Sequence, residues 1–187
     1  MIFTMKSKFD TFQIIPSIRR LSDLEAALNS QSEIVLLTEA HIANLKDLVK
    51  LAHQKNKLVL VNLELVGGFG KDQTGIKLMK NYYQVDGVMS TDQSKLNLAR
   101  HNGLFTIQRF FLHDSRALDT SMRLLQSSSV DAAELLPAKI SIDFIETIRQ
   151  VTAIPLLAGG FIHDTKMIEV IQAAGFNGMT VSDKALW

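Results

Sequence analysis

Short apolar segments alternate with longer amphipathic segments along the whole chain. Most of the short segments are continuously apolar, which is typical of parallel strands covered on both faces. The sequence predicts eight strands, over residues 13–18, 33–38, 57–64, 86–91, 104–109, 131–137, 154–158 and 176–182. Between them, apolar positions recur with the helical period most clearly over residues 44–55, 114–128 and 139–151.

Residues that favour the ends of helices and strands fall between these segments. Aspartates that can serve as N-caps stand where three helices should begin: Asp92, Asp114 and Asp164. Residues that tolerate a left-handed C-terminal cap follow helical segments: Asn56, Asn102, Gly103 and Gly175. The three prolines lie at strand ends, where a missing N–H is best tolerated: Pro16, Pro137 and Pro155.

Eight strands alternating with helices predict a small (β/α)8 TIM-barrel-like fold, with residues 1–187 forming a single domain. The barrel would be minimal, at about 23 residues per βα unit, below the usual size of this fold. An open doubly wound sheet is the alternative, although eight evenly spaced strands favour closure. A faint half-barrel repeat supports the barrel, since Val-Asp-Gly-Val at 85–88 resembles Phe-Asn-Gly-Met at 176–179.

Composition narrows the class of protein. With 47% hydrophobic and 21% charged residues, the chain is not disordered, and a net charge of +1 excludes a strongly polybasic or acidic protein. The absence of cysteine excludes a disulfide scaffold and thiolate chemistry. No apolar run is long enough for a signal peptide or a membrane span, so we expect a cytoplasmic protein that does not contact the membrane.

Function in such a barrel is located at the carboxyl-terminal ends of the strands. Strand parity predicts that polar side chains point into the mouth from several strands: Glu64, Ser90, Gln108, Glu134 and Ser182. Cations would ring them: Arg19, Lys71, Arg109 and Lys139. Burying a carboxylate without a partner is costly, so the two glutamates favour a binding site. The alternative is that they form a buried structural pair balanced by these cations.

Glycines after the seventh strand suggest a phosphate site. Gly159 and Gly160 end that strand and Ser182 follows the eighth, where many barrels bind phosphate through backbone N–H groups. The pair could equally form only a tight turn. The glycine-rich segment 67–72 lacks the spacing of a Walker A loop or a dinucleotide fingerprint. The five histidines are scattered, so no metal site is expected.

Charge is distributed unevenly along the chain. Residues 46–123 carry 12 Lys and Arg against 7 Asp and Glu, whereas residues 124–187 carry 4 against 7. Within the basic part, Lys46, Lys50 and His53 lie at helical spacing, with Lys57 just beyond. These lysines are candidates for RNA binding. The alternative is that they form an ordinary solvated helix face.

Several motifs together resemble the glycerol uptake operon antiterminator family. They are Gln-Arg-Phe-Phe-Leu-His-Asp-Ser at 108–115, Glu-Leu-Leu-Pro at 134–137, Ile-Pro-Leu-Leu-Ala-Gly-Gly-Phe-Ile at 154–162 and the closing Leu-Trp at 186–187. Ile-Ile-Pro-Ser-Ile-Arg at 14–19 and Asn-Leu-Glu-Leu at 62–65 also fit. The resemblance covers nearly the whole chain, in order.

The resemblance implies a small barrel that is not an enzyme and needs no cofactor. It would sense glycerol 3-phosphate and bind the leader of a glycerol-catabolic mRNA, so that transcription reads past a terminator. Gly159, Gly160 and Ser182 would then hold the phosphate. Glu64, Gln108 and Glu134 would hold the glycerol hydroxyls. A minimal barrel offers little surface for RNA, so we also expect a homodimer.

The sequence departs from the family pattern at five positions near the mouth: Glu64, Asp92, Ala138, His163 and Asp183. Two alternatives therefore stay open. One is a phosphosugar isomerase or aldolase, with Glu64 or Glu134 as general base and Lys71 or Lys139 as electrophile or amine. The other is a divergent paralogue that binds a different small phosphorylated ligand or only a protein partner.

Overall fold

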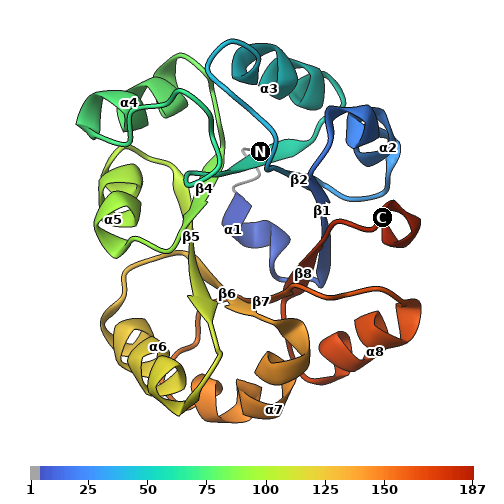
Figure 1. The fold of residues 1–187 in the computed structure, drawn as a ribbon, viewed down its shortest axis with the longest axis vertical. Helices are drawn as coiled ribbons and strands as arrows, with labels where there is room; N and C mark the ends of the chain where they lie inside the picture. Colours follow the sequence, from blue (N-terminus) through green and yellow to red (C-terminus); the bar gives the residue numbers. More distant parts are fainter. Residues whose placement is uncertain (1–4) are drawn as a thin grey trace.

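The computed structural model describes residues 5–187 and shows a closed barrel of eight parallel strands. Each strand pairs with the next along the chain, and the last pairs with the first through Gln13–Gly178 and three further residue pairs. Helices form an outer ring around the strands (Figure 1). The predicted (β/α)8 fold is therefore confirmed, and the open-sheet alternative is wrong.

The strands occupy the segments that the apolar pattern predicted. They are β1 Gln13–Ile18, β2 Ile34–Leu37, β3 Leu58–Asn62, β4 Gly87–Ser90, β5 Phe105–Phe111, β6 Ala132–Leu136, β7 Leu156–Gly159 and β8 Gly178–Val181. The helices are α1 Met5–Lys8, α2 Leu24–Asn29, α3 Leu45–Gln54, α4 Gln73–Asn81, α5 Gln93–His101, α6 Ser115–Ser127, α7 Ala138–Arg149 and α8 Thr165–Ala173. Short 3-10 helices, η1 Leu21–Asp23 and η2 Lys184–Leu186, complete the chain.

Side chains of both strand faces are buried, which explains the continuous apolar runs. One set of alternate residues fills the barrel interior, including Ile15, Leu60 and Ile107. The other set, including Val61 and Leu135, packs under the surrounding helices. Because both sets avoid water, the strands show no alternation of polar and apolar positions.

The amino-terminal end of the barrel is closed by α1, which the sequence pattern did not predict. Met5 and Phe9, one helical turn apart, are 6% and 2% exposed. The ring of Phe9 stacks on Phe105, the first residue of β5, with the centroids 5.5 Å apart. In Figure 1, α1 lies within the ring of strands. Met5 and Phe9 therefore cover the barrel interior at this end.

The half-barrel repeat, at residues 85–88 and 176–179, makes equivalent contacts in the two halves of the barrel. The carboxylate of Asp86, just before β4, accepts the backbone N–H of Val59 at 2.8 Å and contacts the His53 ring at 2.8 Å. Before β8, the amide oxygen of Asn177 accepts from the backbone N–H of Leu156 at 3.0 Å and from the Arg149 guanidinium at 2.6 Å. Each residue thus joins the start of the preceding strand to the last turn of a helix.

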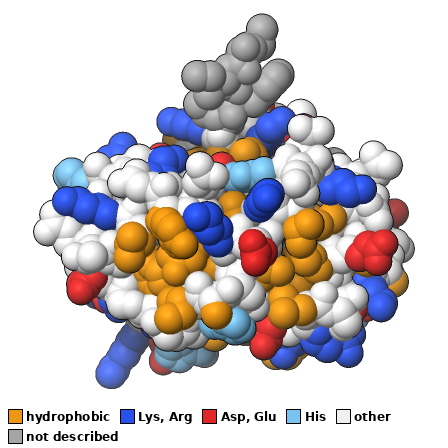
Figure 2. Space-filling view, turned by 90° about the horizontal axis from the view of Figure 1, so that it is seen from above, with side chains coloured by type: hydrophobic (Ala, Val, Ile, Leu, Met, Phe, Trp, Pro, Cys, Tyr) orange, Lys and Arg blue, Asp and Glu red, His pale blue; other side chains and the backbone are white. Residues whose placement is uncertain are grey.

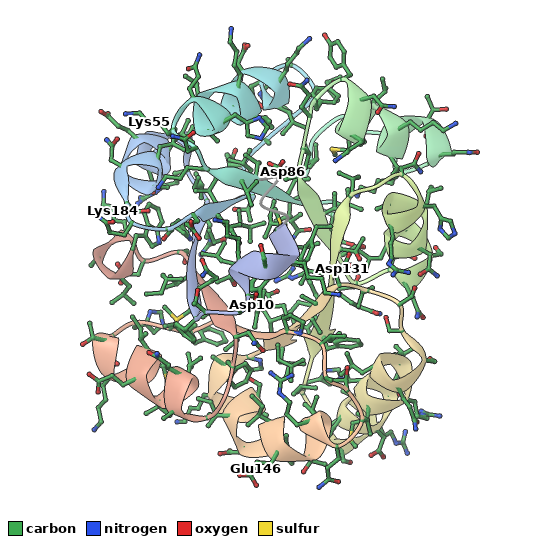
Figure 3. The ribbon with its side chains drawn as sticks, turned by 180° about the vertical axis from the view of Figure 1, so that it is seen from behind. Asp10, Lys55, Asp86, Asp131, Glu146 and Lys184 are labelled. Carbon is green, nitrogen blue, oxygen red and sulfur yellow. The ribbon has the colours of Figure 1, made fainter. Side chains whose placement is uncertain are left out.

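Asp131 makes a related contact between β6 and β5. Its carboxylate accepts the backbone N–H and the hydroxyl of Thr106, at 2.9 and 2.8 Å. Asp86 and Asp131, both labelled in Figure 3, lie beside the strands, whereas Glu146 lies at the outer edge on α7. Polar residues at strand starts therefore fix the register of the barrel.

The three predicted N-caps are confirmed, as are three of the four predicted left-handed residues; the exception is Asn102, with a φ of −93°. Asp92, Asp114 and Asp164 each accept a backbone N–H in the first turn of their helix. The hydrogen bond from the Ser94 hydroxyl, with further bonds from Lys95, holds the pKa of Asp92 far below its usual range. Past the helix ends, left-handed backbone occurs at Asn56, Gly103 and Gly175.

Candidate functional site

A pocket of about 440 Å³ opens at the carboxyl-terminal ends of the strands. Two guanidinium groups and one imidazole line it from three directions: Arg19 after β1, Arg109 on β5 and His163 after β7. Hydroxyl and amide groups line it between them: Ser17, Thr38, Asn62, Thr180 and Ser182. Its walls therefore offer positive charge and hydrogen-bond donors to a small polar anion.

A buried ion pair forms one wall of the pocket. Glu134 on β6 is 1% exposed, and its Oε2 lies 2.5 Å from Nε of Arg109. Its Oε1 accepts the hydroxyl of Thr180 at 2.5 Å. Both carboxylate oxygens are thus hydrogen-bonded, as a buried carboxylate requires. The contacts hold Arg109 and Thr180 in fixed positions facing the pocket.

Gly159 makes room for this carboxylate. A Cβ atom at position 159 would lie 2.6 Å from Oε1 of Glu134 and 3.0 Å from Oγ1 of Thr180. Any larger residue there would displace the Glu134 side chain. Gly160, the next residue, lines the pocket and adopts a φ of 83°, a conformation that glycine adopts without strain.

Five of the residues predicted as ligand contacts line this one pocket: Arg19, Arg109, Glu134, Gly160 and Ser182. Gly159 lies behind the wall, against Glu134. Sequence reasoning did not select Ser17 and Thr38. Both are polar residues at the ends of apolar strands, and that position was the signal for finding them.

Glu64, Lys71 and Ser90 form a separate cluster beside the pocket. The Ser90 hydroxyl donates to Oε1 of Glu64 at 2.5 Å, and the backbone N–H of Thr91 donates to the same oxygen at 3.2 Å. The Lys71 ammonium contacts the backbone carbonyl of Glu64 at 3.4 Å. The structure brings these three predicted residues together, yet none of them lines the pocket.

The prediction that Gln108 points into the mouth is wrong. Phe105 and Ile107 fill the barrel interior, so side-chain alternation along β5 directs Arg109 to the pocket and Gln108 outward. Gln108 is 1% exposed, and its Oε1 accepts the Ser128 hydroxyl at 3.4 Å. A one-residue error in the inward-facing positions exchanges the two faces of a strand. The error arose because polar residues of β5 lie on its outer face, whereas the prediction took polarity as the mark of the inner face.

The three lysines predicted to bind RNA do not form one free stripe. Lys46 on α3 lies over the Tyr82 ring, 3.8 Å from its centroid, and Lys50 is exposed. Lys57 donates to the carbonyls of Ser30 and Ser32 at 2.7 and 2.6 Å, and burial lowers the pKa of its ammonium. Figure 2 shows that hydrophobic side chains also gather in two groups on the face over α3.

The lysines that the aldolase alternative invoked lie outside the pocket. Within residues 5–187, no lysine lines it, and Lys139 is exposed in the first turn of α7. The same residues hold no cluster of three or more side chains that could bind a metal ion. Nor does this part of the chain contain a helix long and apolar enough to cross a membrane. The arrangement is suited to binding a small anion.

Comparisons with known proteins agree with this geometry. The model of the glycerol-3-phosphate responsive antiterminator family matches residues 14–187. The glycerol uptake operon antiterminator regulatory protein from Listeria monocytogenes str. 4b F2365 is 32% identical, with a TM-score of 0.87 over 94% of both chains. An antiterminator-related protein from Thermotoga maritima MSB8 shares the fold, at 22% identity and a TM-score of 0.83 over 95% of this chain and 98% of that one. The uncharacterized protein YgcP of Escherichia coli (strain K12) is 26% identical over 177 residues, 93% of this chain and 91% of its own.

Proposed function

The chain belongs to the glycerol-3-phosphate responsive antiterminator family, and on this premise we propose that it binds glycerol 3-phosphate in the pocket and, in response, the leader RNA of a glycerol-catabolic operon. The pocket carries this proposal. It presents fixed positive charge and hydroxyl groups at the functional end of a barrel that α1 closes at the other end. One domain would then hold both activities, without catalysis or a cofactor.

The pocket offers distinct places for the two ends of the ligand. Arg19 and Ser182 line it and also line a neighbouring depression with Arg20 and Asp23, so they stand at the opening. The phosphate would lie against these two residues and the turn at Gly160. The glycerol hydroxyls would lie deeper, toward Arg109 and Thr180. Charge-assisted hydrogen bonds to phosphate are the strong ones in such a site.

Thermal unfolding tests the ligand. Glycerol 3-phosphate at about 100 times its dissociation constant should stabilise the fold by about 2.7 kcal/mol, a shift of roughly 5–10 °C for a chain of this size. Glycerol and inorganic phosphate are the controls. Arg19→Gln should weaken the shift, whereas Arg100→Gln, on the exposed last turn of α5, should leave it intact. An equal shift with phosphate alone would contradict the proposal and favour a different ligand.

Direct binding and transcription assays test the RNA. The leader transcribed upstream of the first glycerol-catabolic gene in the source genome should bind saturably, and its affinity should fall steeply with salt. Glycerol 3-phosphate should raise read-through of the terminator in a purified transcription system. Leader RNA that binds no more tightly than a scrambled RNA of equal length, with and without ligand, would refute this part. Analytical ultracentrifugation of the free protein tests the expected homodimer.

Lys46 and Lys50 stay predicted contacts to the RNA backbone. Their joint replacement by glutamine should weaken leader and scrambled RNA alike, because phosphate contacts carry no sequence information. Lys57 is a matched comparison, since its ammonium is already bound to two carbonyls.

A further inference from the structure

Two segments at the mouth of the barrel repeat each other. Residues 111–116 read Phe-Leu-His-Asp-Ser-Arg, and residues 161–166 read Phe-Ile-His-Asp-Thr-Lys. The first begins on the last residue of β5 and the second just after β7, so both lie at the carboxyl-terminal end of the barrel. We call them the paired rim segments. All six positions match in chemical type.

Two of the repeated positions have a clear role in the fold. The second residue of each segment is in the core, with Leu112 2% and Ile162 4% exposed. The fourth is an N-cap, since Asp114 and Asp164 accept the backbone N–H groups of Ala117 and Met167 at 2.7 and 2.8 Å. These two positions therefore serve the fold.

The first, third and sixth positions face solvent in both segments. The two phenylalanines are exposed: Phe111 by 48% and Phe161 by 76%. The basic residues Arg116 and Lys166 are exposed, and neither forms an ion pair with another residue between 5 and 187. A large apolar ring and a cation therefore recur at the same exposed positions of both segments, and burial accounts for neither.

Phe161 is also held in an unfavourable backbone conformation. Its φ is 59°, directly after Gly160 at 83°. A bulky residue rarely adopts a positive φ, and such strain persists mainly at functional sites. Because the ring is three-quarters exposed, burial of the side chain does not offset this strain.

Both rings are connected to the ligand pocket. Phe161 and His163 line the pocket itself. The guanidinium carbon of Arg109 lies 5.3 Å from the centroid of the Phe111 ring, while its Nε contacts the Glu134 carboxylate. A ligand that binds Arg109 therefore acts on a side chain that also touches one of the rings.

We propose that the paired rim segments form the surface that holds unpaired bases of the RNA, which stack on Phe111 and Phe161 while Arg116 and Lys166 bind backbone phosphates; any backbone contacts of Lys46 and Lys50 lie outside this surface. This inference rests on the proposed function and names the surface that performs it. Exposed aromatic rings beside cations are the combination by which proteins bind single-stranded nucleic acid. The Phe161 ring lines the pocket and is 76% exposed, so it is accessible to a base beside the opening.

Substitutions at the rings test the proposal. Phe161→Gly should reduce the affinity for leader RNA about 5- to 150-fold, the effect of losing one base–aromatic stack. It should not lower the melting temperature, because glycine adopts a positive φ without strain. Phe161 also lines the pocket, so retention of ligand binding is tested elsewhere: the joint Arg116→Gln and Lys166→Gln variant, at two residues outside the pocket lining, should keep the thermal shift with glycerol 3-phosphate. Phe144→Leu is the matched control, since Phe144 is a partly exposed phenylalanine on α7 outside both segments.

Two further readouts separate stacking from charge. In Phe161→Trp, the fluorescence of the new indole should be quenched when RNA binds, and wild-type protein, with Trp187 alone, gives the baseline. Joint replacement of Arg116 and Lys166 by glutamine should reduce the salt dependence, the slope of log K against log salt, by about 1.4, as expected for two lost phosphate contacts on a single strand. Phe111→Leu should also diminish the effect of glycerol 3-phosphate on RNA affinity.

The outcomes distinguish this inference from the proposed function. If wild-type protein binds the leader and both Phe161→Gly and Phe111→Leu bind it within twofold of wild type, the rim is not the RNA surface, although the antiterminator function stands. If wild-type protein binds no leader RNA with or without ligand, both proposals are wrong. Loss of RNA binding in the ring variants, together with weaker RNA binding but a retained thermal shift in the joint Arg116 and Lys166 variant, supports the inference.

Discussion

Gly159→Ala should destabilise the protein far more than a single added methyl group suggests. The new Cβ would lie 2.6 Å from Oε1 and 3.0 Å from Cδ of the Glu134 carboxylate, which is 1% exposed. That carboxylate cannot move into solvent, so it must give up its contacts with Thr180 or Arg109. Disrupting a buried pair in this way costs about 3–5 kcal/mol, a large share of the roughly 5–15 kcal/mol that stabilises a typical domain.

Urea unfolding followed by circular dichroism measures this loss. Gly160→Ala is the control: a Cβ there would meet nothing closer than 3.7 Å, so only its φ of 83° is unfavourable. That substitution should cost about 1–2 kcal/mol. Gly159→Ala should also abolish the thermal shift with glycerol 3-phosphate, since the displaced carboxylate no longer positions Arg109.

A double-mutant cycle tests the reason for the loss. In a Glu134→Ala background the carboxylate that obstructs the new Cβ is gone, so adding Gly159→Ala should cost less than about 1 kcal/mol, and the interaction energy should be large. An equal cost in both backgrounds would refute the reasoning, because the obstruction would then come from another group.

The remaining predictions concern the fold. Asp92→Ala should lower the free energy of unfolding by about 1 kcal/mol at pH 7 through loss of the N-cap, as measured by urea unfolding. Because the pKa of Asp92 is lowered in the folded state, this stabilisation is present above pH 4 and is lost as the pH falls below about 4. Phe9→Ala should cost about 3–5 kcal/mol and admit the dye ANS to the barrel interior. Asp86→Ala should cost about 1–3 kcal/mol by leaving the Val59 N–H without its partner; Asp86→Asn should cost less, as judged by melting temperature, because Asn177 makes the same contact at β8.

The strands were predictable because each is buried on both faces, which leaves a short apolar run bounded by caps and turns. The predicted limits of the first strand coincide with β1, Gln13–Ile18. By contrast, the sequence did not show α1. Met5 and Phe9 are only two apolar residues one turn apart, and their burial depends on the open end of a closed barrel, a feature of the whole fold.

The site was predictable where a polar residue in or just after an apolar strand points into the pocket, as Glu134 and Ser182 do. It was not predictable on β5, because polar residues occur on both of its faces. Thr106 is hydrogen-bonded to Asp131 and Gln108 to Ser128, so these two polar residues are buried because each has a partner on the outer face. Glu64 and Ser90 illustrate a third case, in which two predicted residues form a hydrogen bond with each other beside the pocket. Sequence shows which residues are polar and buried, whereas partners decide which way they point.

The pairing of β1 with β8 determines when the barrel can close during synthesis of the chain. These strands join residues 13–16 to residues 178–181, and the amide of Asn177 donates to the carbonyl of Phe9 at 3.1 Å. At about 5–20 residues per second, a ribosome needs roughly 8–33 s to proceed from the first strand to the last. Throughout that interval β1 has one unpaired edge, which is a site for aggregation. The nascent chain thus keeps this unpaired edge until β8 has been made, and conditions that slow translation of the codons just before and within β8 should lower the yield of folded protein.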